Sequence, residues 1–308
     1  MKFKKILIII LCVALGFCLS GCGKKIDESG EKIVASFYPM YIIALNLTND
    51  VPNVNLHNMA DNQVGCLHNY TLQTADLKKI ENANVFIKNG LGIENFMDKV
   101  TQIYPNLNVI DASQSDLNLI KDEDEDELNG HVWNSIENYK KQVSYIATEL
   151  ERINPENAEL YSENARKYIE KINKIDLYKT ENDEYVISCN EAFEYLLQDA
   201  NLKVIPVYTD HDESSLSSGI ISKVINEAKE KQVKAIVIDE QDDIKNAEII
   251  SKETGAQIIK LNSNLYGEND KDSYLNAMKS NFDILRKTFE KWVMRWKRVK
   301  VVDFIVLK

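Results

Sequence analysis

The chain has 308 residues, of which 44% are hydrophobic and 28% are charged, as in ordinary globular proteins. This length predicts one large domain or two medium-sized ones. The formal net charge of −11 argues against nucleic acid as the partner, because phosphate binding requires clustered lysine and arginine side chains.

The N-terminus has the pattern of a bacterial export signal. Three lysines among the first five residues precede an apolar stretch, 6–17, that is too short to span a membrane comfortably. The sequence Leu-Ser-Gly-Cys then ends at Cys22 and resembles a lipobox. We therefore expect a lipoprotein signal peptide over 1–22, lipidation of Cys22, and a mature protein held at the cell membrane outside the cytoplasm.

A polar segment, 23–31, predicts a short tether, and we expect an N-terminal lobe over 32–153. Within it, apolar runs typical of strands alternate with segments of helical periodicity. This order predicts a mostly parallel sheet covered by helices on both faces. Strands are expected over 33–38, 51–57, 84–90 and 106–112, and helices over 74–83 and 93–103.

The same alternation returns over 183–289 and predicts a second lobe of the same class, so the expected fold is α/β with two lobes. Its strands are expected over 184–189, 202–208, 233–240 and 256–261.

One long helix is expected to join the two lobes over 154–179. Asn154 and Pro155 have the pattern of a helix start, and no glycine or proline follows before Tyr178. At ~1.5 Å per residue, about 24 residues span roughly 36 Å. Such a helix would act as a rigid strut and would limit the hinge motion between the lobes.

The last residues, 290–308, form an atypical tail that is locally basic and contains two of the three tryptophans. Its final segment, 301–308, reads as a strand. The tail could add a strand, face a membrane with its basic and aromatic side chains, or lie outside the fold. We expect a poorly ordered extension.

The chain has four histidines, and two of them lie in informative places. His68 precedes the helix expected over 74–83, and His131 joins a run of six acidic residues to a helix that opens near Ser135. Binding residues gather on such loops at the carboxyl ends of strands in α/β proteins.

Several segments resemble one family in consistent order. Residues 66–100 (CLHNYTLQTADLKKIENANVFIKNGLGIENFMDKV), 131–133 (HVW) and 154–172 resemble the zinc- and manganese-binding substrate-binding lipoproteins of bacterial ABC transporters. The segments ISCNEAFEYL, VKAIVIDEQ, AEIISKETGA and SYLNAMKSNFDIL resemble the C-terminal lobe of that family. The resemblance runs from about Ile33 to Phe289.

The resemblance implies a metal ion, Zn2+ or Mn2+, held between the lobes by two side chains from each. His68 and His131 match the two ligands of the N-terminal lobe. The third position, a His or Glu before a small and an aromatic residue, is placed at Asn190, and the fourth falls near Asn262. Amide oxygens are weak ligands for zinc, so Asp239, where the family commonly carries Glu, is expected to complete the site.

The resemblance also implies the partners. The loaded protein would dock on an ABC permease whose ATPase is a separate chain, because no ATP-binding motif occurs here. Three alternatives remain open: a zinc hydrolase, which would lack the usual H-E-x-x-H or G-x-S-x-G signatures; a surface adhesin; and a carrier of a metal chelate. We expect a transport protein rather than an enzyme.

Two further features leave alternatives open. Cys66 and Cys189 lie within two positions of expected ligands and could form a disulfide, offer a thiolate or remain unpaired. The acidic run Asp122–Glu127 falls where the family often inserts a variable loop before its second histidine. It is either a mobile collector of cations or a solvated loop.

Overall fold

The computed structural model describes residues 30–60, 67–68, 70–121, 128–207 and 218–306, which from Glu31 onward belong to one compact unit, Glu31–Lys308. All eight expected strands are present, with bounds that differ by a few residues. They are β1 (Glu31–Ala35), β2 (Val54–Asn58), β3 (Val85–Lys88), β4 (Asn108–Asp111), β5 (Tyr185–Ser188), β6 (Lys203–Pro206), β7 (Ala235–Asp239) and β8 (Gln257–Leu261).

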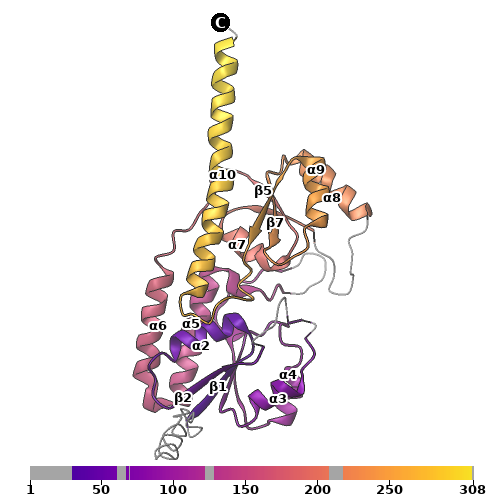
Figure 1. Ribbon diagram of the computed structural model, residues 1–308. Helices are drawn as coiled ribbons and strands as arrows, with labels where there is room; N and C mark the ends of the chain where they lie inside the picture. Colours follow the sequence, from indigo (N-terminus) through magenta and orange to yellow (C-terminus); the bar gives the residue numbers. More distant parts are fainter. Residues whose placement is uncertain (1–29, 61–66, 69, 122–127, 208–217, 307–308) are drawn as a thin grey trace, which may run out of the picture. The chain divides into compact units, whose positions relative to one another are not determined.

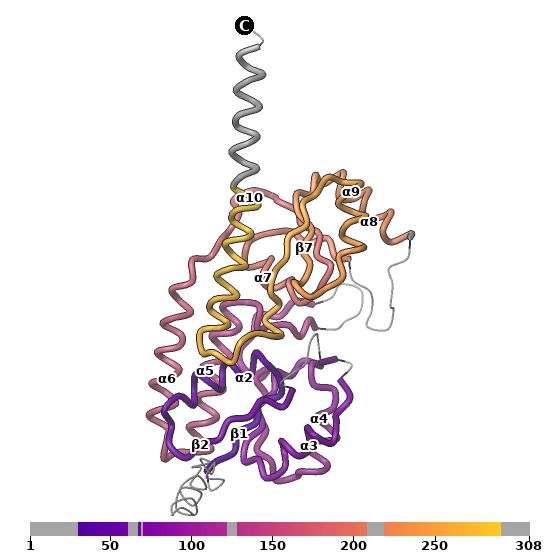
Figure 2. Tube along the Cα trace, in the orientation of Figure 1, coloured from indigo at the N-terminus to yellow at the C-terminus, as the bar shows by residue number. Residues whose placement is uncertain are grey.

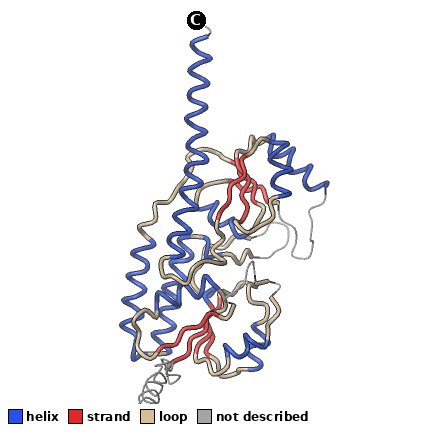
Figure 3. Tube along the Cα trace, in the orientation of Figure 1, coloured by secondary structure: helices blue, strands red, loops and turns tan. Residues whose placement is uncertain are grey.

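The strands form two four-stranded sheets, ordered β2-β1-β3-β4 and β6-β5-β7-β8. Figure 3 shows the strands in red, with helices and loops around them. All pairings between these strands are parallel, which confirms the two-lobed α/β fold. In each sheet the strand order reverses at the central pair, β1/β3 or β5/β7. Ligands of such sheets bind beyond the carboxyl ends of the strands at that point.

Helices alternate with the strands (Figure 1). The central strand β7 is buried at all five positions, as expected of a parallel strand with both faces covered. The α-helices are α2 (Tyr38–Leu47), α3 (Thr74–Ile80), α4 (Met97–Ile103), α5 (Ile136–Ile153), α6 (Ala158–Ile172), α7 (Glu194–Asp199), α8 (Ser218–Glu230), α9 (Lys245–Thr254) and α10 (Ser273–Val306). Four 3₁₀ turns are η1 (Ala112–Gln114), η2 (Val132–Asn134), η3 (Pro155–Asn157) and η4 (Glu191–Phe193).

The helix expected over 154–179 is shorter than predicted. It begins with the turn η3, and α6 ends at Ile172. The apolar pattern continues to Ile175 and Leu177, but these side chains pack on the core from a non-helical segment. The apolar residues of the sequence therefore continue at helical spacing past the residue where α6 ends. Helix α6 packs along α5 and α2, as the trace in Figure 2 also shows for α5.

The strand-like interpretation of the last residues is wrong, because α10 continues to Val306 and makes 301–306 helical rather than extended. That the tail is poorly ordered stays a prediction. No glycine or proline interrupts the chain after Ser273, and β-branched residues cost a helix only a few tenths of a kcal/mol each. Among the helices of the described ranges, none is both long enough and apolar enough to cross a membrane.

Some sequence predictions concern residues outside the described ranges. They are the signal peptide and lipidated cysteine (1–22), most of the tether, Cys66 and the acidic run (122–127).

Candidate metal centre

Three side chains that could hold a metal ion converge in the structure. His68, His131 and Glu191 offer ligand atoms that all lie within 4.8 Å of one another. Oε1 of Glu191 lies 3.9 Å from Nε2 of His68 and 3.7 Å from Nδ1 of His131. Zinc ligands lie about 2.0–2.2 Å from the ion, so possible ligand atoms within 4.8 Å of one another need to draw together by only roughly an ångström to share one.

His68 lies between β2 and α3. Its carbonyl oxygen accepts a hydrogen bond of 3.0 Å from the side chain of Asn95. Just beyond it, Asp76 in the first turn of α3 accepts hydrogen bonds from the Tyr70 hydroxyl and the Gln73 backbone N–H, both at 2.7 Å. These contacts fasten the end of the histidine loop to the start of α3.

His131 lies immediately before η2 and is almost fully buried. Its ring centroid is 5.1 Å from that of Trp133, which is itself completely buried. Trp133 donates from Nε1 to the Ser263 carbonyl at 3.0 Å, and its own carbonyl accepts from the Tyr274 hydroxyl at 2.9 Å. Contacts with residues of the second lobe thus hold the segment that carries His131.

The third member of the cluster, Glu191, was missed by the sequence analysis, which placed the ligand at Asn190. Both ends of the Asn190 side chain have other partners: Oδ1 caps η4 by accepting from the Ala192 N–H at 3.0 Å, and Nδ2 donates to Asp242 at 3.1 Å. This cap leaves the next residue, Glu191, to join the two histidines. The sequence does contain the expected pattern one residue later, because the Glu-Ala-Phe motif over 191–193 places Glu191 before a small and an aromatic residue.

Asp239 also lies outside the cluster. Its buried carboxylate accepts hydrogen bonds from the Tyr266 hydroxyl, the Gln241 N–H at 2.9 Å and the Ser263 N–H at 3.1 Å. Burial and this bond to Asp239 raise the pKa of Tyr266, so its hydroxyl stays a donor. Asp239 therefore fastens the loop after β8 to the end of β7. Within that loop, the side chain of Asn262 contacts Glu240 and the Asn264 N–H.

Other expected contributors do not add a ligand to the cluster in the described part of the chain. Cys189 is a free thiol, and burial raises its pKa to about 12, which disfavours the thiolate that binds metals. His57, which was not an expected ligand, is exposed on the edge strand β2.

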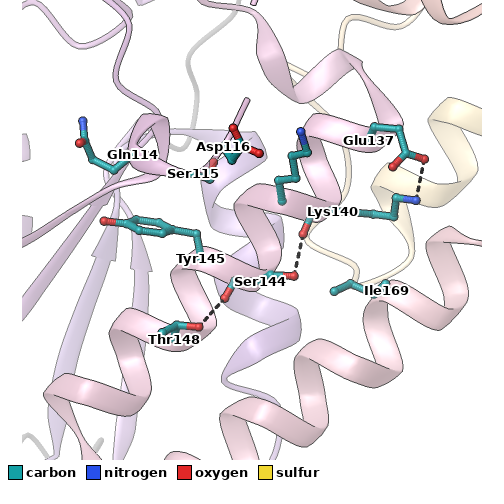
Figure 4. A pocket seen from close by; sticks show the side chains of 10 residues that line it. Gln114, Ser115, Asp116, Glu137, Lys140, Ser144, Tyr145, Thr148 and Ile169 are labelled. Atoms are coloured by element: carbon teal, nitrogen blue, oxygen red, sulfur yellow. Dashed lines mark hydrogen bonds and ion pairs between the residues drawn. The ribbon is translucent and has the colours of Figure 1, made fainter. Parts of the chain in front are cut away.

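A separate groove of about 510 Å³ lies over α5 and α6 and contains none of the cluster residues (Figure 4). Four of its polar side chains have partners within α5: Lys140 pairs with Glu137 at 2.7 Å, and the Ser144 and Thr148 hydroxyls donate to carbonyls one turn earlier. This groove presents no convergent set of ligand groups.

Comparison with known proteins agrees with this site. A family model described as the periplasmic component A of a zinc-uptake complex, ZnuA, matches residues 33–288. The high-affinity zinc uptake system protein ZnuA of Bacillus subtilis is 27% identical, over 92% of this chain and 97% of that protein. The manganese-binding lipoprotein MntA of Halalkalibacterium halodurans is 22% identical, over 91% and 96%.

Solved structures share the fold. FpvC of Pseudomonas aeruginosa in complex with Mn2+ superposes with a TM-score of 0.75 at 24% identity, covering 85% of this chain and 99% of that one. The laminin-binding protein Lmb of Streptococcus agalactiae, described as having adhesin and metal-transporting activity, gives 0.72 at 21% identity over 84% and 99%. Because the family model spans most of the chain, this protein is a transport component rather than an enzyme, and it belongs to the ZnuA family of periplasmic zinc-uptake components.

Proposed function

We propose that this protein captures a divalent transition-metal ion, zinc or manganese, between His68, His131 and Glu191 and delivers it to an ABC importer. The observation that carries the proposal is the convergence of these three side chains within 4.8 Å. Residues on both sides of the expected inter-lobe helix contribute, so binding an ion would draw separate parts of the chain together. The small spacing favours a bare ion over a bulky metal chelate.

The donor set suits more than one metal. Two imidazoles and one carboxylate are good ligands for zinc and also for manganese and iron, and they leave at least one coordination position for water or a further group. Glu191 supplies a negative charge that the expected set of two histidines and an amide would have lacked next to a dication. Availability of the metal, rather than the donor set alone, would then decide which ion is carried.

Delivery requires partners outside this chain. We infer that the loaded protein docks on a membrane permease, whose separate ATPase drives the transfer. Lipidation of Cys22 would hold the protein at the membrane next to that permease, and stable anchoring requires two membrane-binding signals, such as two acyl chains. Radiolabelled palmitate incorporation into wild type, but not into Cys22→Ser, would support this attachment.

Calorimetric titration of the purified protein with ZnCl2 and MnCl2 tests the proposal. Wild type should bind one ion, and His131→Ala should weaken binding at least 100-fold. His57→Ala is the matched control, because His57 is exposed and lies outside the cluster. If His131→Ala bound both metals as tightly as wild type, the site would be wrong.

Adhesion is a second candidate, since the fold neighbour Lmb is described as an adhesin as well as a metal transporter. Growth of a deletion strain in metal-poor medium separates the two roles. Failure to grow, reversed by added zinc or manganese, supports transport, whereas unimpaired growth with lost adherence to host matrix supports adhesion.

A further inference from the structure

Asn129, two residues before His131, uses both ends of its side chain at the metal site. Oδ1 accepts a hydrogen bond of 2.9 Å from the His131 backbone N–H and lies 3.0 Å from Nδ1 of the same residue. Nδ2 donates to the Glu194 carboxylate at 2.8 Å and to the Glu191 carbonyl at 3.1 Å. These partners define the orientation of the Asn129 amide. In the flipped orientation its oxygen would face two other acceptors, the Glu191 carbonyl and the Glu194 carboxylate, and its NH2 would face the His131 N–H donor.

This orientation determines the tautomer of His131. An amide oxygen can only accept, so Nδ1 must carry the hydrogen, and in the neutral imidazole the lone pair then resides on Nε2. Metal-binding histidines usually donate their other ring N–H to such a partner, which keeps the ring orientation and makes the ligand nitrogen more basic. The ring of His131 is almost fully buried, so Asn129 rather than bulk water sets this choice.

The same side chain ties together two distant parts of the chain. Its contacts join the segment before η2 to the Glu191 carbonyl and to Glu194 at the start of α7, 62 and 65 residues away. The main chain of Asn129 adds to this link, since its carbonyl accepts from the Tyr195 hydroxyl at 2.7 Å. His131 and Glu191 are therefore held to one common point, whereas His68 approaches from a separate loop.

We propose that Asn129 is a positioning residue of the metal site, which sets the His131 tautomer and fastens His131 to Glu191 as a preassembled pair of ligands. This inference rests on the proposed function, because it assigns a role in binding the same ion. When two ligands are already held in place, metal binding loses less side-chain entropy. Mutation of residues that hydrogen-bond to metal ligands typically weakens metal binding by about 10- to 100-fold.

The test combines zinc titration of the full-length protein with ¹⁵N NMR of its histidine rings. Metal-free wild type should show His131, identified by the loss of its signals in His131→Ala, as the Nδ1–H tautomer. Asn129→Leu keeps the size of the side chain but removes its hydrogen bonds. It should bind zinc about 10- to 100-fold more weakly and show a mixture of tautomers.

Two further variants separate positioning from simple support of the fold. The double variant Asn129→Asp/Glu194→Gln keeps the total charge, retains an acceptor for His131 and restores a donor–acceptor pair with position 194. It should recover zinc affinity to within about threefold of wild type and keep the Nδ1–H tautomer. Asn154→Leu is the matched control: Asn154 likewise donates to a glutamate, Glu31, but away from the cluster, so it should lose stability without changing zinc affinity.

The outcomes distinguish this inference from the proposed function. If wild type bound no zinc, or if Glu191→Gln bound it as well as wild type, the proposed function would fail. If zinc binding depended on Glu191 while Asn129→Leu bound within threefold of wild type, only the role of Asn129 would be overturned. An Nε2–H tautomer of His131 in metal-free wild type would also overturn it, and that result needs no variant to fold.

Discussion

Neutralising Glu191 should cost far more metal affinity than removing its neighbour Asn190. The perturbation is Glu191→Gln, which keeps the side-chain shape and one oxygen but removes the negative charge that lies 3.7–3.9 Å from the histidine nitrogens. Two unit charges about 4 Å apart interact by about 4 kcal/mol at an effective dielectric constant of about 20, a dication doubles this, and a ligand oxygen lies closer still to the ion, at about 2.0–2.2 Å.

Only part of that energy appears as affinity. The Glu191 side chain is 28% exposed, so water screens it, and binding must strip water from the carboxylate and the ion. The amide oxygen of glutamine can also still touch the metal. We therefore expect a net loss of about 3–4 kcal/mol of binding free energy, which corresponds to a 100- to 1,000-fold larger dissociation constant for zinc.

Asn190→Ala should behave differently, because it removes the cap of η4 and no ligand. Lost caps cost about 0.5–2 kcal/mol of stability, so the free energy of unfolding should fall while zinc affinity changes less than tenfold. Calorimetric zinc titration and urea unfolding of the metal-free protein measure both quantities, with the exposed Glu248→Gln on α9 as the charge control. The reasoning is refuted if Asn190→Ala loses more affinity than Glu191→Gln.

Three other predictions follow from described contacts. Tyr266→Phe should lower the free energy of unfolding in urea by about 1–3 kcal/mol, because it removes a donor to the buried Asp239 carboxylate, and it should leave zinc affinity nearly unchanged. A loss of zinc affinity beyond tenfold would indicate that Asp239 contributes to the metal site. Burial raises the pKa of Glu94, so the native state holds its proton more tightly, and wild type should lose stability relative to Glu94→Gln as pH rises upward from about 4.5. A flat difference between their unfolding free energies from pH 4.5 to 8 would contradict this. Deleting 122–127 should leave high-affinity zinc binding intact in calorimetry. The residues on either side form an antiparallel bridge, with Cα atoms ~5 Å apart, so the cut ends are close enough to join. Loss of high-affinity binding in the deletion variant would make the acidic run part of the zinc site.

Local sequence patterns were enough to predict the fold of this protein. Short apolar runs alternating with amphipathic segments predicted all eight strands and the parallel sheets, since strand burial on both faces leaves a continuous apolar signature. His68 and His131 were also candidates from their neighbouring residues alone, and the structure brings them together. Their role as ligands stays a prediction until metal binding is measured.

Tertiary structure decided what local patterns could not. Whether Asn190 or Glu191 joins the histidines depends on which side chain caps η4, and a one-residue shift changes an amide ligand into a carboxylate. Asp239 was predicted as a ligand because it falls where the family commonly carries Glu and would supply negative charge, yet its oxygens accept from three donors that lie 2, 24 and 27 residues away. The two distant partners reach Asp239 only when β7, β8 and the loop after β8 are folded. The sequence alone therefore determined the architecture and singled out the two histidines. The partners of Asn190, Ala192 in the cap of η4 and the distant Asp242, left Glu191 as the third member of the cluster.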